Sequence, residues 1–258
     1  MTGAEGLLLD IDGVLAISWE PIPGSVEAMA ALRSRGIPYR LITNTTTQTR
    51  ADLATTLQGA GFEVTSEEIV TAVVATATFL AEHHPDAKVF VLTDGDPGAD
   101  LGGIVRVAVP EDADVIVIGG ANDDFAYDTI NRIFRRLRDG ATLVGMHRNL
   151  YWRTSRGWEL DGGAYIAGLE EATGVTATIC GKPALAYFEA ALHLLGLSAE
   201  RVAMVGDDIV NDVLGAQAAG LTGVLVRTGK FQESDLQKGT PDGVLGALSD
   251  LPGWLGNG

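Results

Sequence analysis

The chain has few of the features that tie a protein to an oxidising compartment or to a membrane. Its single cysteine, Cys180, excludes an intramolecular disulfide and fits a reducing compartment. The sequence shows no basic N-terminal stretch followed by an apolar run, and no segment approaches the roughly 20 apolar residues that span a bilayer. We therefore expect a soluble, cytoplasmic protein.

Positive charge is also scarce. Eighteen Lys and Arg residues stand against 34 Asp and Glu residues, for a net charge of −16. This charge repels nucleic-acid phosphates and anionic lipid surfaces, so neither nucleic acid nor a membrane is an expected partner. An acidic protein that acts on phosphate esters needs a local positive site, which a metal ion, a lysine or oriented backbone N–H groups can supply.

Apolar segments alternate between two kinds along the chain, and no repeat or low-complexity tract interrupts them. Short continuous apolar runs indicate strands buried on both faces of a parallel sheet, and segments with helical spacing lie between them. We expect an α/β, doubly wound parallel sheet with right-handed crossovers. The predicted strands are 6–9, 39–42, 202–205 and 224–226, and the predicted helices begin after Gly24, at Thr49, at Ala184 and after Asn211.

The middle of the chain has a β/α rhythm of its own. Strands near 88–92, 105–107, 115–118 and 143–145 accompany a helix at 127–138. Because the first pattern resumes afterwards, we expect residues 1–75 and 180–258 to form one domain and residues 76–179 to form a second α/β domain inserted into it.

Four polar residues stand at or beside the predicted carboxyl ends of strands: Asp10, Thr43, Lys182 and Asp207. Ligands of doubly wound sheets bind at this edge. Each residue alone is more typical of a surface turn or a helix start, but all four in such positions indicate a shared site.

Carboxylates dominate this set. Asp12 follows Asp10 by two residues, before a glycine that permits a sharp turn, and Asp208 adjoins Asp207. Clustered carboxylates repel one another unless a cation joins them, and oxygen ligands favour Mg²⁺. We therefore expect a magnesium site formed by Asp10, Asp12, Asp207 and Asp208.

The combined pattern resembles the haloacid dehalogenase (HAD) superfamily of phosphatases. The long insertion after the second motif is similar to the branch with a large α/β cap, that of nitrophenyl-phosphate, nucleotide and pyridoxal phosphatases, and within it to the group of phospholysine phosphohistidine inorganic pyrophosphate phosphatases. The four motifs are Asp10-Ile11-Asp12-Gly13-Val14-Leu15, Thr43-Asn44-Thr45, Gly181-Lys182-Pro183 and Gly206-Asp207-Asp208-Ile209-Val210-Asn211-Asp212.

The resemblance implies a role for each motif residue. Asp10 is the nucleophile that forms an aspartyl-phosphate, and Asp12 is the general acid and base and lends its backbone carbonyl to Mg²⁺. Thr43, with N–H groups around Asn44 and Thr45, binds phosphoryl oxygens, and Lys182 offsets their charge. Asp207 ligates the metal with Asp208 as a further contact, and Asp212 supports the site.

The resemblance also implies a small phosphorylated metabolite as substrate, and it leaves open a homodimer formed through the cap. The chain departs from the branch at residues 149–163, where Tyr151, Trp152 and Arg153 stand in place of a proline-containing stretch. We expect this segment to be a loop that selects the substrate, with Tyr151 and Trp152 as substrate contacts. Packing of an ordinary loop is the alternative.

Three other functions deserve comparison. A phosphorylation-switched receiver domain uses similar residues, but its acidic pair precedes its phosphoacceptor and such domains are much shorter than 258 residues. A dinucleotide oxidoreductase lacks support because no Gly-x-Gly-x-x-Gly follows the first strand. A phosphotransferase or phosphomutase would share all four motifs, so the sequence leaves that alternative open.

Overall fold

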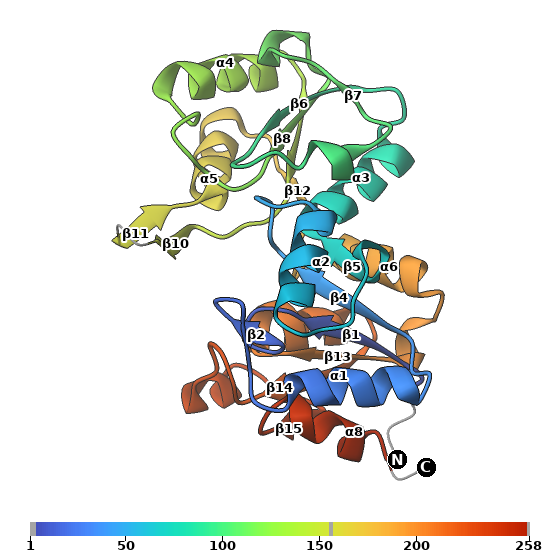
Figure 1. The fold of residues 1–258 in the computed structure, drawn as a ribbon. Coiled ribbons are helices and arrows are strands. Elements are labelled where there is room, and N and C mark those ends of the chain that lie inside the picture. Colours follow the sequence, from blue (N-terminus) through green and yellow to red (C-terminus); the bar gives the residue numbers. More distant parts are fainter. Residues whose placement is uncertain (1–3, 155–156, 257–258) are drawn as a thin grey trace. The chain divides into compact units, whose positions relative to one another are not determined.

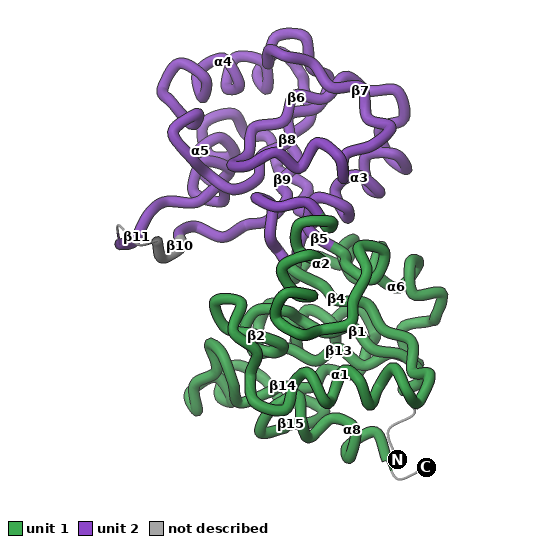
Figure 2. Tube along the Cα trace, viewed as in Figure 1, with its two compact units in different colours: residues 1–43, 50–70, 182–258 green, residues 44–49, 71–181 purple. Residues whose placement is uncertain are grey.

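A computed structural model of the chain describes residues 4–154 and 157–256, which divide into two compact units. Unit 1 comprises residues 1–43, 50–70 and 182–258, and unit 2 comprises residues 44–49 and 71–181 (Figure 2). Among the described residues, no helix is both long enough and apolar enough to cross a membrane.

Unit 1 is organised around a six-stranded sheet in the order β15-β14-β13-β1-β4-β5. Strands β15, β14, β13, β1 and β4 run parallel, as expected of a doubly wound sheet. Its strands are β1 (Gly6–Asp10), β4 (Tyr39–Thr43), β5 (Ile69–Thr71), β13 (Val202–Gly206), β14 (Thr222–Val226) and β15 (Gly243–Leu245), and its helices are α1 (Ser25–Ser34), α2 (Arg50–Gly59), α6 (Leu185–Leu195), α7 (Gly215–Ala218) and α8 (Leu251–Trp254) (Figure 1).

Both faces of this sheet are covered. Alternate side chains along a strand point to opposite faces of the sheet, and all five residues of β1 are buried. Side chains on both faces of β1 are therefore covered. Leu7 and Leu9 pack on one face in a cluster with residues of α1, α2 and α8. Leu225 of β14 packs in a different cluster with Ile209 and Val213. The prediction of a doubly wound parallel sheet is therefore confirmed.

The helix expected after Asn211 begins earlier. A π-helical segment, η5 (Ile209–Leu214), directly follows Asp208 and continues into α7. The Asp208 side chain caps it by accepting hydrogen bonds from the N–H groups of Val210 and Asn211. This start brings Asp212 into the first turn.

Unit 2 has a five-stranded sheet of its own, in the order β12-β9-β8-β6-β7, and all its neighbouring strands are parallel. Ile133 and Leu137, one turn apart on α4, are buried in its core. The strands are β6 (Lys88–Leu92), β7 (Val105–Arg106), β8 (Val115–Ile118), β9 (Thr142–Gly145) and β12 (Thr178–Ile179), and the helices are α3 (Ala72–His83), α4 (Tyr127–Arg138) and α5 (Gly162–Thr173) (Figure 1). The expected second α/β domain is present.

Two antiparallel ribbons complete the fold. One joins β2 (Ala16–Ile17) to β3 (Glu20–Pro21) just after the first motif. The other joins β10 (Tyr151–Thr154) to β11 (Gly157–Leu160), in the segment that we expected to be a loop. Trp158 and Leu160, which alternate along β11, are both exposed, so the apolar side chains of this strand face solvent.

Candidate active site

Three neighbouring strands of unit 1 end in polar residues. Asp10 is the last residue of β1, Thr43 is the last residue of β4, and Asp207 directly follows β13. Because β13, β1 and β4 are adjacent and parallel, their carboxyl ends meet at one edge of the sheet. Asp10, Thr43 and Asp207 are all buried there, although each is polar.

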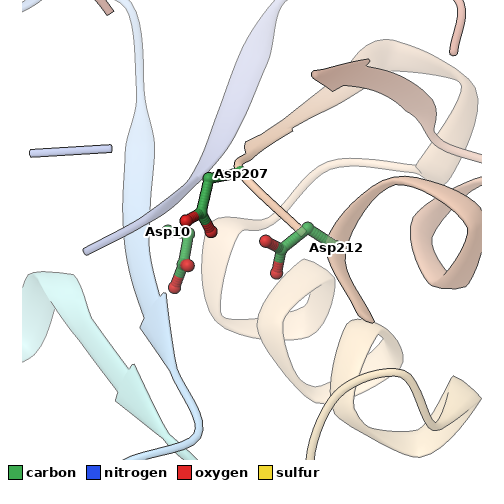
Figure 3. A group of neighbouring side chains, drawn as sticks. All are labelled: Asp10, Asp207 and Asp212. Carbon is green, nitrogen blue, oxygen red and sulfur yellow. The ribbon is translucent and has the colours of Figure 1, made fainter. Parts of the chain in front are cut away.

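Three carboxylates converge at this edge. One carboxylate oxygen from each of Asp10, Asp207 and Asp212 lies within 4.8 Å of the other two (Figure 3). Burial raises the pKa of Asp10, although Lys182 works in the opposite direction. Burial likewise raises the pKa of Asp207 and that of Asp212 to about 6 each. Keeping three buried carboxylates ionised therefore requires positive charge beside them.

Lys182 supplies part of that charge. Its Nζ donates hydrogen bonds to Asp10 Oδ1 and to Asp212 Oδ1, both at 2.7 Å. Lys182 is only 5% exposed, and burial alone would lower its pKa. The attraction of Asp10 and Asp212 outweighs burial, so the pKa of Lys182 is raised and the side chain remains a cation.

Asp207 is held from one side only. Its Oδ2 accepts a hydrogen bond of 2.6 Å from the backbone N–H of Lys230. Its Oδ1 is buried and has no hydrogen-bond partner among the residues that the structure describes. A buried carboxylate oxygen without a donor is costly, and a cation would satisfy it.

Glycines make room for this arrangement. A Cβ on Gly13 would lie 2.1 Å from Asp207 Oδ2, and one on Gly229 would lie 2.0 Å from the same atom. Both glycines have positive φ angles, 82° at Gly13 and 63° at Gly229, a conformation that disfavours other residues. Any side chain at either position would displace the Asp207 carboxylate.

The donor set fits Mg²⁺. Asp10 and Asp207 contribute carboxylate oxygens, the ligand type that Mg²⁺ prefers, and Asp207 Oδ1 lacks a hydrogen-bond partner in the described part of the chain. Mg²⁺ is usually held by only one or two carboxylates, with waters and substrate phosphate completing its ligands. The site therefore has the chemistry of a magnesium site.

Asp208 and Asp212 differ in what they contact. Asp208 is outside the converging carboxylate group, and its oxygens accept hydrogen bonds from Val210 N, Asn211 N and Asn211 Nδ2. Asp212, expected only as support, is buried within the group and contacts Lys182 directly. Asp212, in the first turn of η5, is therefore the residue of this motif that contacts Lys182.

Tyr187 is a further buried residue that sequence reasoning missed. Its hydroxyl accepts a hydrogen bond from Thr43 N at 2.9 Å and donates to the carbonyl oxygen of Val70 at 2.7 Å. It thereby links the end of β4 to the middle of β5. Its position on the helix that follows Lys182 could have indicated a place near the site. A buried tyrosine on such a helix is equally typical of a core residue.

The remaining motif residues differ in burial. Asp12, beyond the end of β1, is exposed, and Asn44 and Thr45 are half-buried. Asn44 and Thr45 belong to unit 2, where Asn44 Oδ1 would lie 2.8 Å from a Cβ placed on Gly181. A side chain at Gly181 would therefore press against Asn44.

The hairpin β10–β11 presents aromatic residues to solvent. Tyr151 and Trp158 are 61% and 70% exposed, and their rings pack edge-on with centroids 5.5 Å apart. Trp152 and Arg153 belong to β10, but their side chains lie outside the described residues.

The two glycines that follow the hairpin make close backbone contacts within unit 2. A Cβ on Gly162 would lie 1.8 Å from the carbonyl oxygen of Gly119, and one on Gly163 would lie 2.4 Å from that of Asn149. Both glycines therefore allow other backbone segments of unit 2 to approach closely.

The sequence matches two family models and curated relatives over most of its length. Residues 7–101 match haloacid dehalogenase-like hydrolase, and residues 179–251 match HAD-hydrolase-like. Human haloacid dehalogenase-like hydrolase domain-containing protein 2 is 35% identical over 93% of this chain and 91% of its own. Human phospholysine phosphohistidine inorganic pyrophosphate phosphatase is 34% identical over 91% of this chain and 87% of its own.

Solved structures extend this similarity to the fold. The p-nitrophenyl phosphatase from Archaeoglobus fulgidus has a TM-score of 0.90 and 31% identity, covering 97% of this chain and 99% of its own. The similarity therefore includes both the unit that carries Asp10 and Asp207 and the inserted unit. Together these matches show that the chain belongs to the haloacid dehalogenase-like hydrolase family, among relatives named as phosphatases.

Proposed function

We propose that this hydrolase is a Mg²⁺-dependent phosphatase that hydrolyses a small phosphorylated metabolite through an aspartyl-phosphate on Asp10. The observation that carries the proposal is the convergence of Asp10, Asp207 and Asp212 around the Lys182 ammonium. This arrangement supports the proposal, because it would bring a carboxylate nucleophile, a fixed cation and a set of metal-binding oxygens together.

In the first step, a carboxylate oxygen of Asp10 attacks the phosphorus atom of the substrate. A bond forms between that oxygen and phosphorus while the bond from phosphorus to the leaving oxygen breaks. Asp12, whose side chain is exposed just beyond β1, donates a proton to the leaving oxygen. The products are an aspartyl-phosphate and a free alcohol or acid.

In the second step, Asp12 takes a proton from a water molecule, which attacks the same phosphorus atom. The bond from phosphorus to Asp10 breaks, inorganic phosphate leaves, and the Asp10 carboxylate is restored. Splitting one displacement into two lets Asp12 serve as acid and then as base, so both residues return to their starting states.

The phosphoryl group is bound by fixed donors. We assign this role to Thr43, to backbone N–H groups around Asn44 and Thr45, and to Lys182. The Tyr187 hydroxyl holds the backbone of Thr43 through its N–H, and Lys182 is fixed by two carboxylates. Donors that are held before substrate arrives lose little freedom in the transition state, which is why they lower the barrier.

For the metal, we propose Asp10, Asp207 and the backbone carbonyl of Asp12 as ligands. Mg²⁺ would offset the negative charge of the carboxylates and of the phosphoryl oxygens. Asp208 shapes the start of η5 through its capping bonds and remains a further candidate contact. Asp212 orients Lys182, and it also accepts a hydrogen bond from Asp208 N at 3.1 Å.

Substrate choice requires contacts outside the motifs, because every phosphate ester carries the same phosphoryl group. We propose that unit 2 serves as a cap and that its segment 149–163 selects the substrate, with Tyr151 and Trp152 as substrate contacts. The relatives named above act, by their names, on phospholysine, phosphohistidine, inorganic pyrophosphate and p-nitrophenyl phosphate, which indicates small compounds. We also propose a cytoplasmic location and self-association through unit 2.

The test is phosphate release from a panel of phosphorylated metabolites, with Mg²⁺ and after removal of metal by a chelator. We expect turnover only with Mg²⁺, restored when Mg²⁺ is added back, and none in Asp10→Asn. Borohydride trapping should label Asp10 during turnover. Full activity without metal, or near wild-type turnover by Asp10→Asn, would refute the mechanism.

Sugar or alcohol acceptors separate hydrolysis from phosphoryl transfer. Free phosphate released at the same rate without an added acceptor supports hydrolysis, whereas release that depends on the acceptor would identify a transferase. A phosphoenzyme that persists for minutes would instead indicate a phosphorylation switch.

A further inference from the structure

The loop that follows β14 is fixed beside the carboxylate cluster. The Thr228 hydroxyl donates a hydrogen bond to the carbonyl oxygen of Gly13, and Gly229 lies against Asp207. Two residues further on, Phe231 packs on the apolar cluster of Ile209, Val213 and Leu225. Lys230 therefore has an anchored residue on each side.

Lys230 is the second lysine of this site. Its backbone N–H holds Asp207 Oδ2, and its ammonium interacts electrostatically with Asp207 and Asp10. Lysine is protonated at neutral pH, and the neighbouring carboxylates favour its charged form. The side chain is therefore a cation throughout the neutral range.

The two lysines differ in position. Lys182 is buried and donates to Asp10 and Asp212, whereas Lys230 is exposed. Lys182 therefore lies inside the cluster, and Lys230 lies at its solvent-facing rim. The part of a substrate that extends beyond the reacting phosphoryl group is also nearer to solvent.

The electrostatics of a working site favour an anion next to Lys230. A divalent cation at Asp10 and Asp207 would repel the Lys230 ammonium, as Lys182 already does. An anionic group bound between them would turn this repulsion into attraction. The transferred phosphoryl group already has Lys182 and the Thr43 donors in the proposed function, so a second anionic group of the substrate is the natural partner.

We propose that Lys230 is a specificity-determining residue whose ammonium binds a negatively charged oxygen of the leaving group, so that the enzyme prefers phosphorylated compounds whose leaving group is itself an anion, a phosphate or a carboxylate. This inference rests on the proposed function. It assigns the loop after β14, in unit 1, a part in substrate selection that is separate from that of the hairpin β10–β11.

The experiment compares Lys230→Met and Lys230→Arg with the wild-type enzyme on two substrates. The leaving group of inorganic pyrophosphate is an anionic phosphate. The leaving group of p-nitrophenyl phosphate has no charged group apart from the oxygen that is bonded to phosphorus. Both variants keep the backbone N–H that holds Asp207. Lys238→Met is the matched control, because Lys238 is an exposed lysine of the same unit that pairs with Asp235.

We expect Lys230→Met to lower kcat/KM for pyrophosphate at least about tenfold more than kcat/KM for p-nitrophenyl phosphate, because a hydrogen bond to a charged group is lost only with the former. Lys230→Arg should restore most of the ratio, and Lys238→Met should leave it unchanged. Phosphate and carboxylate leaving groups are then distinguished by adding a carboxyphenyl phosphate, whose carboxylate is charged in the bound substrate, to the comparison.

Binding without turnover gives a second measurement. Calorimetry with methylenediphosphonate and with methylphosphonate, both in Mg²⁺, should show that Lys230→Met weakens the diphosphonate at least about tenfold more than the monophosphonate. Equal losses for both ligands, or equal kinetic losses for both substrates, would overturn the proposal while leaving the phosphatase mechanism intact. A wild-type enzyme that hydrolyses neither substrate would instead count against the proposed function.

Discussion

Lys182 and Asp212, 30 residues apart in sequence, form a buried ion pair with an Nζ–Oδ1 distance of 2.7 Å. Asp10 accepts from the same ammonium at the same distance. The lysine is thus held between two carboxylates, one of which is the proposed nucleophile. A substitution of Asp212 would therefore change how Lys182 is held and leave the Asp10 side chain itself unchanged.

Asp212→Asn should therefore reduce turnover. The amide keeps the size of the side chain but removes the charge that holds Lys182, so kcat should fall at least about tenfold. The free energy of unfolding should fall by about 1–3 kcal/mol, the usual cost of weakening a buried hydrogen bond to a charged group. Urea unfolding and steady-state kinetics measure the two effects. Glu189→Gln, an exposed carboxylate on α6, is the control, and equal kcat in both variants would exclude a role for Asp212.

Gly229→Ala should disrupt the metal site. A methyl group there would lie 2.0 Å from Asp207 Oδ2 and 2.5 Å from the Cα of Gly13, so the carboxylate must move. The Mg²⁺ concentration for half-maximal activity should rise at least about tenfold. Gly36→Ala is a matched control, because Gly36 has a similar φ of 68° and nothing within 4 Å of its added Cβ. Both variants carry the backbone strain, and only Gly229→Ala should change Mg²⁺ activation.

Tyr187→Phe should loosen the end of β4. The substitution leaves the buried N–H of Thr43 without the hydroxyl that it donates to, which costs about 1–3 kcal/mol of stability. Because Thr43 is a proposed phosphoryl ligand, kcat should fall as well. Tyr127→Phe, at a tyrosine that is 87% exposed, should change neither quantity. A Tyr187→Phe enzyme with wild-type stability and kcat would show that the hydroxyl contributes nothing.

The stability of unit 2 should depend on pH through His147. Burial lowers the pKa of His147 from the usual value of 6.5, and its Nδ1 accepts a hydrogen bond from Asn149 N, which requires an unprotonated nitrogen. Between the lowered pKa and 6.5, the unfolded chain binds a proton that the folded chain does not, so stability rises with pH. The contribution is fully present above 6.5 and is lost as pH falls through that window.

The measurement is urea unfolding of wild type and His147→Gln at several pH values from 5 to 8, without metal. The raised pKa values of Asp207 and Asp212 act in the opposite direction, since those groups hold protons in the folded state. The difference between the two proteins isolates the histidine. It should shrink as pH falls, and a difference that is constant with pH would contradict the assignment.

The hairpin β10–β11 should affect selectivity more than general catalysis. Replacing Tyr151 and Trp158 by alanine removes the exposed aromatic pair, and we expect kcat/KM ratios between substrates to change more than tenfold, or roughly 1.4 kcal/mol. Thermal melting should verify that unit 2 remains folded. Loss by one common factor for all substrates would argue against a role in selection.

Local patterns in the sequence were enough to predict the framework of the site. Continuous apolar runs ending at Asp10, Thr43 and Asp207 identified three buried strands, and these strands are adjacent in the sheet. The parallel α/β class and the inserted second domain followed from the same patterns, and the resemblance to the haloacid dehalogenase superfamily identified the four motifs. These features depend on residues close in sequence, whose burial and spacing are visible in the chain itself.

The tertiary structure alone decided which groups meet around the strand ends. The hydrogen bond between Lys182 and Asp212 joins two motifs that lie on different elements, and the spacing of the motifs does not specify it. Tyr187 and Lys230 reach the site from a helix and a loop that are distant in sequence from Thr43 and Asp207. Contacts of this kind are set by the packing of whole elements. Two side chains meet only if both of their backbones are placed correctly, and a local sequence pattern describes the surroundings of just one of them.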